Sequence, residues 1–204
     1  NAFTFIAQRD EVDPERIGVI GHSFGAAVAV YTAGVDERFA CVISSCGWGD
    51  GERKFRGQHP TPEAWAKFTG ILEAGRKHKE ETGESLWVSR FDVVPIPEPL
   101  RKNLSPKALF EVPVETAISM YNFRADDVIA NIAPRPLLLF HTANDSITPT
   151  EQSIRMFEKA GAPAELMLVN GTSHFPLSEK DAPRTRVLIR SWLDQFFPTP
   201  LRGR

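Results

Sequence analysis

The stretch Arg16-Ile17-Gly18-Val19-Ile20-Gly21-His22-Ser23-Phe24-Gly25 decides the fold of this chain. Its first half is a short apolar run, which is typical of a buried strand. Residues 21–25 form a glycine-containing break, and the following residues up to Gly34 are rich in alanine and valine and contain no proline, which predicts a closely packed helix. The stretch therefore predicts a strand, a sharp turn and a helix, with Ser23 in the turn.

The turn itself matches the pattern G-x-S-x-G. A serine held in a strained turn at the tip of a strand needs glycine neighbours, so that strand and helix can approach closely. Such a turn also aims the backbone N–H of Phe24 and the amino terminus of the helix at one point, where a negative oxygen can be stabilised. This context predicts that Ser23 is a nucleophile and that Phe24 supplies an oxyanion donor. The alternative is a tight turn with a capping serine.

The rest of the chain continues the alternation of strands and helices. Apolar runs predict strands at residues 39–44, 136–140 and 164–169, and helical patterns follow at 150–160 and 182–197. Nearly continuous apolar runs that alternate with helices indicate a mostly parallel sheet with helices on both faces. We therefore expect a single α/β domain over residues 1–204.

Residues 47–127 interrupt this alternation. Helices are predicted at 62–79 and 114–121, and the stretch 87–99 carries prolines at positions 95, 97 and 99. An insertion of this length predicts a largely helical lid, or cap, over a site. Its aromatic side chains either line an apolar substrate pocket or only pack the insertion together; these are Trp65, Phe68, Trp87, Phe91, Tyr121 and Phe123.

A serine hydroxyl becomes a good nucleophile only when a base takes its proton and a third group holds the base. Asp145 lies in the loop after the predicted strand 136–140, and His174 lies in the loop after 164–169. Because the carboxyl ends of parallel strands share one edge of the sheet, both loops should meet the turn that holds Ser23. The sequence therefore predicts a catalytic triad of Ser23, His174 and Asp145, in the order Ser…Asp…His.

The other titratable candidates are predicted to be structural. His22 is expected to point away from Ser23, and His141 to be packed or hydrogen-bonded at the end of a strand. His59 and His78 lie in the insertion and have no acid or nucleophile at an informative spacing. Asp126 and Asp127 precede a turn, where they can cap a helix.

The composition argues against several classes of partner. The chain has 24 basic and 26 acidic side chains and a formal net charge of −2, so neither nucleic acid nor an anionic membrane is expected as a partner. No metal-binding, dinucleotide-binding or phosphate-loop pattern is present, so no metal and no cofactor are expected. Cys41 and Cys46 stand at an odd offset in a predicted strand and cannot pair, which favours a reducing, cytoplasmic location.

With these residues in place, the chain resembles the α/β-hydrolase superfamily, most closely its prolyl-oligopeptidase-like and dienelactone-hydrolase-like branch. The resemblance rests on residues 12–19 before the turn, on residues 133–138 before Asp145, and on residues 150–153 after it. It covers roughly residues 1–46 and 126–197. It implies hydrolysis through an acyl-enzyme on the triad of Ser23, His174 and Asp145.

The chain departs from this family ahead of the turn. In the family, four strands and several helices normally precede the serine, and one of their loops supplies a second oxyanion donor. We therefore expect the flank of the first strand, Ile17 to Ile20, to be exposed. Either an amino-terminal segment or association of copies into a homo-oligomer would complete the sheet.

These observations predict a serine hydrolase that cleaves a carboxylic ester or a related acyl bond in a small-molecule substrate. A serine peptidase of the prolyl-oligopeptidase-like type is one alternative. The other is a catalytically silent scaffold that serves as a binding module, because a fold does not determine a function.

Overall fold

The computed structural model describes residues 2–171, 173–177 and 182–198 of the chain. Its main sheet has four parallel strands, which lie side by side in the order β1, β2, β5, β6. Their bounds are Gly18–His22, Cys41–Ser45, Leu137–Thr142 and Ala164–Val169. The parallel α/β sheet predicted from the sequence is confirmed.

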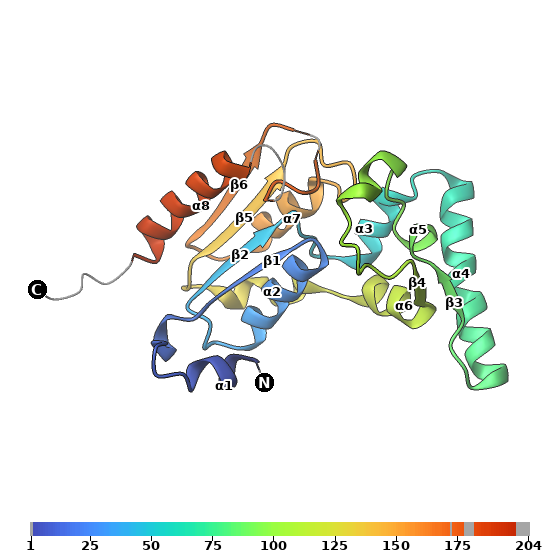
Figure 1. The fold of residues 1–204 in the computed structure, drawn as a ribbon, viewed down its shortest axis with the longest axis horizontal. Coiled ribbons are helices and arrows are strands. Elements are labelled where there is room, and N and C mark those ends of the chain that lie inside the picture. Colours follow the sequence, from blue (N-terminus) through green and yellow to red (C-terminus); the bar gives the residue numbers. More distant parts are fainter. Residues whose placement is uncertain (1, 172, 178–181, 199–204) are drawn as a thin grey trace, which may run out of the picture.

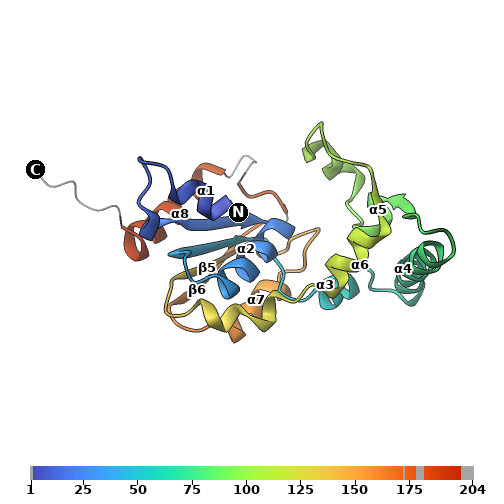
Figure 2. The same cartoon turned by 90° about the horizontal axis from the view of Figure 1, so that it is seen from below.

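Helices cover both faces of this sheet, as predicted (Figures 1 and 2). In the view from below, α2 and α7 lie on one side of the strands, and α1 and α8 lie on the other (Figure 2). The bounds of these helices are Ala2–Ala7 for α1, Phe24–Val35 for α2, Glu151–Lys159 for α7 and Ala182–Phe196 for α8. A short 3-10 helix, η1 (Pro14–Arg16), precedes β1.

Each face of the sheet has its own apolar core, because successive residues of a strand point to opposite sides. Val30 of α2 and Met156 of α7 pack with Leu139 on one face. Trp192 of α8 packs with Phe140 on the other face. The core therefore holds the strands in place and presents their carboxyl ends at one edge.

Strand β1 lies at the margin of the sheet and pairs with β2 alone. Ile20 is 56% exposed, whereas Ile17 is buried. The position of β1 agrees with the expected exposed flank; the side chain of Ile17, which precedes β1, is nevertheless buried.

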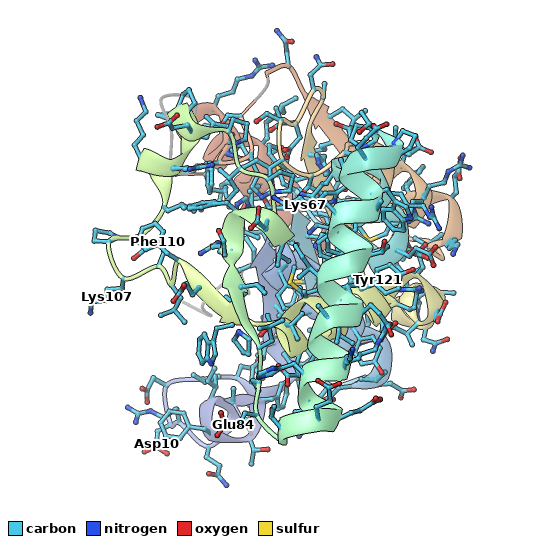
Figure 3. All side chains as sticks on the ribbon, turned by 90° about the vertical axis from the view of Figure 1, so that its right-hand side faces the viewer. Asp10, Lys67, Glu84, Lys107, Phe110 and Tyr121 are labelled. Carbon is cyan, nitrogen blue, oxygen red and sulfur yellow. The ribbon has the colours of Figure 1, made fainter. Side chains whose placement is uncertain are left out.

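Between β2 and β5 the chain forms a separate, largely helical unit, residues 51–122, which we call the cap. The cap lies beyond the carboxyl ends of the strands (Figure 1). Seen from that side, α4 lies in front of the other cap elements (Figure 3). The cap contains α3 (Gly51–Gln58), α4 (Pro62–Thr82), β3 (Trp87–Ser89), α5 (Arg90–Val93), η2 (Glu98–Asn103), β4 (Glu111–Pro113) and α6 (Val114–Asn122).

The cap has its own small core, in which Phe55, Phe68 and Val114 are fully buried. Both helices predicted in the insertion are present as α4 and α6. Helix α3 and the antiparallel pair of β3 with β4 were not predicted. The pattern missed these strands because each has only three residues, which is too short for an apolar alternation to stand out.

The chain returns to the sheet earlier than predicted. Two 3-10 turns, η3 (Ala125–Asp127) and η4 (Ile129–Ile132), follow α6, and Ala125 and Ile129 belong to the core beneath the sheet. The excursion away from the sheet therefore ends near residue 122 and not at 127.

The two chain segments that connect the cap to the sheet are hydrogen-bonded to each other. The N–H of Gly51 donates to the carbonyl of Phe123 at 3.0 Å, and the N–H of Asp126 donates to the carbonyl of Gly49 at 2.9 Å. The carboxylate of Asp126 is 1% exposed and accepts from Arg53 of the cap and from Lys159 of α7, at 2.9 Å each. Asp126 is therefore an ionic joint, and its expected role as a helix cap is wrong.

Among the described residues, no helix combines the length and the apolar character needed to cross a bilayer. Cys41 and Cys46 are both buried and unpaired, in agreement with the prediction that they do not form a disulfide. The cytoplasmic location that they suggested stays a prediction.

Candidate active site

Ser23 occupies the turn between β1 and α2 in a strained backbone conformation, with φ 56° and ψ −121°. Gly21 makes this turn possible, since a Cβ at that position would lie 2.0 Å from the carbonyl oxygen of Gly25. A Cβ at Gly25 would meet nothing within 4 Å. The expectation that both glycines are needed for close packing is therefore correct for Gly21 only.

His174 hydrogen-bonds both to Ser23 and to Asp145. Its Nδ1 lies 2.7 Å from Oδ2 of Asp145, and its Nε2 lies 2.8 Å from Oγ of Ser23. Because an ionised carboxylate only accepts hydrogen bonds, Nδ1 carries the proton and Nε2 accepts from the serine hydroxyl. The structure thus brings together the three residues predicted from the sequence, from loops that follow β1, β5 and β6.

The carboxylate of Asp145 is fully buried and held on both oxygens. Oδ1 accepts from the backbone N–H groups of Ile147 and Thr148, at 2.8 Å and 2.9 Å. Burial on its own raises the pKa of Asp145, but the hydrogen bonds from His141, His174 and the backbone outweigh burial and hold this pKa below its usual value. Asp145 is therefore ionised wherever His174 can act as a base.

His141 supports this carboxylate from inside the sheet, and it is hydrogen-bonded as expected. Its Nδ1 lies 2.6 Å from Oγ of Ser153, and its Nε2 lies 3.1 Å from the carbonyl of Thr148 and 3.4 Å from Oδ2 of Asp145. A carbonyl can only accept, so Nε2 carries the proton and Nδ1 accepts from the hydroxyl of Ser153. His141 was recognised as structural from the sequence, but its place behind the acid was not.

His22 does not point away from the site, so the sequence-based expectation is wrong. Its ring lies 4.9 Å from the ring of His174, and it lines the same pocket as Ser23. Its Nδ1 is 3.4 Å from Oγ of Ser45. Burial, and after it the neighbouring His174, lower the pKa of His22 to about 4, so the ring stays neutral beside the base.

The remaining candidates lie away from the hydrogen-bonded line. His59 stacks on Phe68 in the cap core, with ring centroids 4.6 Å apart, and its Nδ1 lies 2.9 Å from the carbonyl of Phe55. His78 lies on α4, and Asp127 is exposed beside the joint. His59 is thus held in the cap core, and the structural roles expected for His78 and Asp127 stay predictions.

A pocket of about 340 Å³ opens beside Ser23 and His174. The sheet side contributes Phe24 and Trp48, whose rings stack 5.5 Å apart. The cap contributes more than half of the lining, including Lys54, Gln58, Arg90, Val93, Ile96 and Met120.

None of the aromatic residues of the predicted insertion is found in the pocket lining in the described part of the chain; those are Trp65, Phe68, Trp87, Phe91, Tyr121 and Phe123. Trp65, Phe68, Tyr121 and Phe123 pack in apolar clusters instead, whereas Trp87 is 59% exposed. Lys54 was missed, because its stretch Gly51-Glu52-Arg53-Lys54-Phe55-Arg56-Gly57-Gln58 is dominated by charge, as in an exposed helix.

One group of side chains behind the hydrogen-bonded line of Ser23, His174 and Asp145 has the composition of a metal site. Ligand atoms of Cys46, His141 and Asp145 lie within 4.8 Å of one another. These atoms are engaged by the protein, since both nitrogens of His141 and both oxygens of Asp145 have hydrogen-bond partners. Burial raises the pKa of Cys46 to about 12, which keeps the thiol protonated and makes it a poor metal ligand. The group is better suited to holding the carboxylate than to holding an ion.

Two curated proteins are similar to most of this chain. It is 23% identical over 197 residues to an acyltransferase, drtE of Aspergillus calidoustus, and 24% identical over 196 residues to a thiohydrolase, aneE of Aspergillus aculeatus. These alignments cover 89% and 87% of the chain, but only 62% and 60% of the relatives. The chain therefore spans about three-fifths of the length of the curated relatives it matches.

A solved structure shares the fold. The monoacylglycerol lipase of Paleococcus ferrophilus superimposes with a TM-score of 0.68 at 20% identity, over 96% of this chain and 74% of the lipase. A sequence profile described as the alpha/beta hydrolase family matches residues 2–188. Since this match takes in nearly the whole chain, and the parallel sheet and the serine turn agree with it, the protein belongs to the alpha/beta hydrolase family.

Proposed function

We propose that the protein is a serine hydrolase that cleaves a carboxylic ester or a related acyl bond, such as a thioester, in a small-molecule substrate. One observation carries the proposal. Ser23, His174 and Asp145 form a continuous hydrogen-bonded line, with separations of 2.8 Å and 2.7 Å, and Ser23 and His174 line a pocket of about 340 Å³. This is the arrangement that makes a serine hydroxyl nucleophilic.

In the proposed reaction, Nε2 of His174 takes the proton of Ser23 as Oγ attacks the substrate carbonyl. The negative oxygen that forms is stabilised by the backbone N–H of Phe24, which is the first residue of α2 and has no acceptor within that helix. His174 then gives its proton to the leaving group, and an acyl-enzyme remains on Ser23. Water repeats the same steps, with His174 again as base, and releases the acid.

Neighbouring side chains favour this proton transfer. Asp145 stays ionised and stabilises the imidazolium that forms when His174 accepts the proton. His22 is neutral, so it adds no second positive charge beside that imidazolium. His22 and Asp145 thus both favour the transfer of the Ser23 proton to His174.

The lining of the pocket and the relatives support acyl chemistry as the reaction class. Val93, Ile96 and Met120 give the cap side of the pocket an apolar surface, which suits an acyl chain. The names of the two curated relatives, an acyltransferase and a thiohydrolase, describe acyl transfer and thioester cleavage. We propose accordingly that the cap is a lid that forms the acyl-binding pocket.

The test measures hydrolysis of p-nitrophenyl esters and of peptide p-nitroanilides by the full-length protein. The esters are expected to be cleaved faster, and Ser23→Ala should lower ester turnover by about 1,000-fold or more. The control is Ser105→Ala, which changes an exposed serine of the cap and should leave turnover unchanged.

The two alternatives are separate outcomes of the same assay. Faster cleavage of the anilides, with the same dependence on Ser23, would favour the peptidase. Absence of turnover on every ester and anilide, by a folded protein, would favour the silent scaffold.

A further inference from the structure

Lys54 is a buried cation in the wall of the pocket that contains Ser23. It lies in α3, it is 2% exposed, and it lines the pocket together with Ser23 and His174. Its Nζ has no hydrogen-bond acceptor among the described residues. A buried ammonium group is unfavourable unless an acceptor compensates it, so an uncompensated one in a ligand pocket calls for an explanation.

The amine is in contact with aromatic rings. Nζ lies 3.7 Å from the ring centroid of Phe55 and 5.7 Å from that of Trp48. Cation–π contacts of this kind offset only part of the cost of burial. Burial lowers the pKa of Lys54 to about 7, and no acidic group opposes that shift. Within the described part of the chain, this amine therefore lacks the carboxylate that usually accompanies a buried lysine.

The lining near Lys54 offers no acidic partner for its amine, and it includes a second polar group without a hydrogen-bond partner among the described residues. No aspartate or glutamate is found among the lining residues that the structure describes, whereas Arg90 is a second cation there. Gln58 lies one turn after Lys54 on the same face of α3, and its Oε1 is buried and also lacks a partner within the described chain. The α3 side of the pocket is thus a polar patch next to the apolar side chains Val93, Ile96 and Met120.

This polar patch is set back from the reacting atoms. The ring of Trp48 stacks on that of Phe24, which adjoins the nucleophile, and Lys54 lies against Trp48. An acyl group whose carbonyl carbon is at Ser23 would meet Phe24 and Trp48 first. The more distant part of its chain would then reach α3.

We propose that Lys54 makes the pocket selective for oxygenated acyl groups, by donating a hydrogen bond to a keto or carboxylate oxygen carried on the acyl chain away from the scissile carbonyl. The inference rests on the proposed function, since it assigns a substrate class to the same site. The flexible stem of lysine lets the amine turn from the ring of Phe55 toward such an acceptor.

The test compares three p-nitrophenyl esters with five-carbon acyl chains: pentanoate, 4-oxopentanoate and the monoester of glutarate. The measured quantity is kcat/KM, corrected for spontaneous hydrolysis. The full-length wild-type protein should prefer at least one oxygenated ester to pentanoate. A preference for 4-oxopentanoate identifies a keto group as the ligand, and a preference for glutarate identifies a carboxylate.

Lys54→Met should lower the ratio of kcat/KM for the preferred oxygenated ester to kcat/KM for pentanoate by about 10- to 100-fold, which is the usual contribution of a hydrogen bond to a charged group. The control Lys77→Met removes the same charge from the exposed side of α4 and should leave the ratio unchanged. Near-UV circular dichroism establishes that each variant is folded, and if Lys54→Met does not fold, the preference of the wild-type protein decides.

Two results would overturn the inference while leaving the proposed function intact. One is a Ser23-dependent hydrolysis in which the ratio is the same in Lys54→Met and wild type. The other is a wild-type preference for pentanoate over both oxygenated esters. Hydrolysis that survives Ser23→Ala, or no hydrolysis of any ester, would instead reject the proposed function itself.

Discussion

The environment of each ionisable side chain determines what it can contribute at the pocket. Asp145 is buried yet ionised, because two histidine side chains and two backbone N–H groups compensate its charge. Lys54 is buried to a similar degree but has aromatic rings as neighbours and no acceptor among the described residues. The surroundings of Asp145 stabilise its charged form, whereas the surroundings of Lys54 destabilise its charged form.

This difference predicts how stability depends on pH. The pKa of Lys54 is about 7 in the folded protein and near 10.5 when the chain is unfolded. Between these values the unfolded state binds more protons, so the free energy of unfolding should rise with pH. Relative to Lys54→Met, we expect the wild-type protein to gain about 2 kcal/mol between pH 7 and pH 9, at 1.36 kcal/mol per pKa unit.

Urea unfolding of both proteins at a series of pH values measures this gain. Lys77→Met is the matched control and should show the same rise with pH as wild type. A constant difference between wild type and Lys54→Met over this range would mean that the amine of Lys54 is not destabilised by burial.

The sequence carried enough information to bring Ser23, Asp145 and His174 together but not to find Lys54. Ser23, Asp145 and His174 each follow a strand, so the rule that parallel strands end at one edge was enough to bring them together. Lys54 has no such signal. Its burial depends on how α3 packs against Trp48 and the rest of the cap, and tertiary contacts of this kind leave no pattern in a stretch dominated by charge.

At the level of secondary-structure elements, the strand–turn–helix unit at β1 and α2 depends on a close approach of two backbones. Gly21 in the turn faces the carbonyl of Gly25 in the first turn of α2. A side chain at position 21 would force the helix away from the strand and move Ser23 with it. Gly25, in contrast, faces open space.

The two glycines should therefore respond differently to the same substitution. Gly21→Ala should abolish esterase activity and destabilise the fold, because its Cβ would lie 2.0 Å from a backbone oxygen that cannot move independently. Gly25→Ala should be tolerated and should raise the free energy of unfolding by about 0.5–1 kcal/mol, since alanine is the better helix former.

Thermal unfolding and ester turnover of both variants test this prediction. Equal loss of activity in Gly21→Ala and Gly25→Ala would show that the close approach at Gly21 is not what sets the position of Ser23.

Elements with a strong apolar pattern were predictable from the sequence. The short elements of the cap, α3, β3 and β4, were not. The buried strands, such as Leu137–Thr142, are continuous apolar runs with sharp ends. Helix α3 carries an N-cap, Asp50, whose side chain accepts from the N–H of Arg53 at 2.8 Å. The N-cap residue Asp50 was the available signal for α3, but the short, charged sequence after it made the helix hard to recognise.

For the molecule as a whole, the pocket exists because the cap and the sheet are held together across it. The joint is ionic, with Asp126 between Arg53 of the cap and Lys159 of α7. Because Arg53 and Lys159 are partly exposed, their charges remain partly hydrated when the carboxylate is removed.

Asp126→Ala should therefore loosen the cap more than it unfolds the sheet. We expect a loss of about 1–3 kcal/mol in the free energy of unfolding, the usual range for hydrogen bonds between charged groups. KM for esters should rise, because more than half of the pocket lining moves with the cap. Asp127→Ala, which changes the exposed neighbour, is the control and should alter neither quantity. Similar effects of both substitutions on KM and stability would refute the assignment of Asp126 as the joint.

The most direct test of the catalytic proposal is covalent labelling with a fluorophosphonate, followed by peptide mapping by mass spectrometry. The account predicts a single adduct on Ser23 that is absent in Ser23→Ala, greatly slowed in His174→Ala, and unchanged in Ser105→Ala. An adduct on another residue, or labelling of His174→Ala at the wild-type rate, would contradict it.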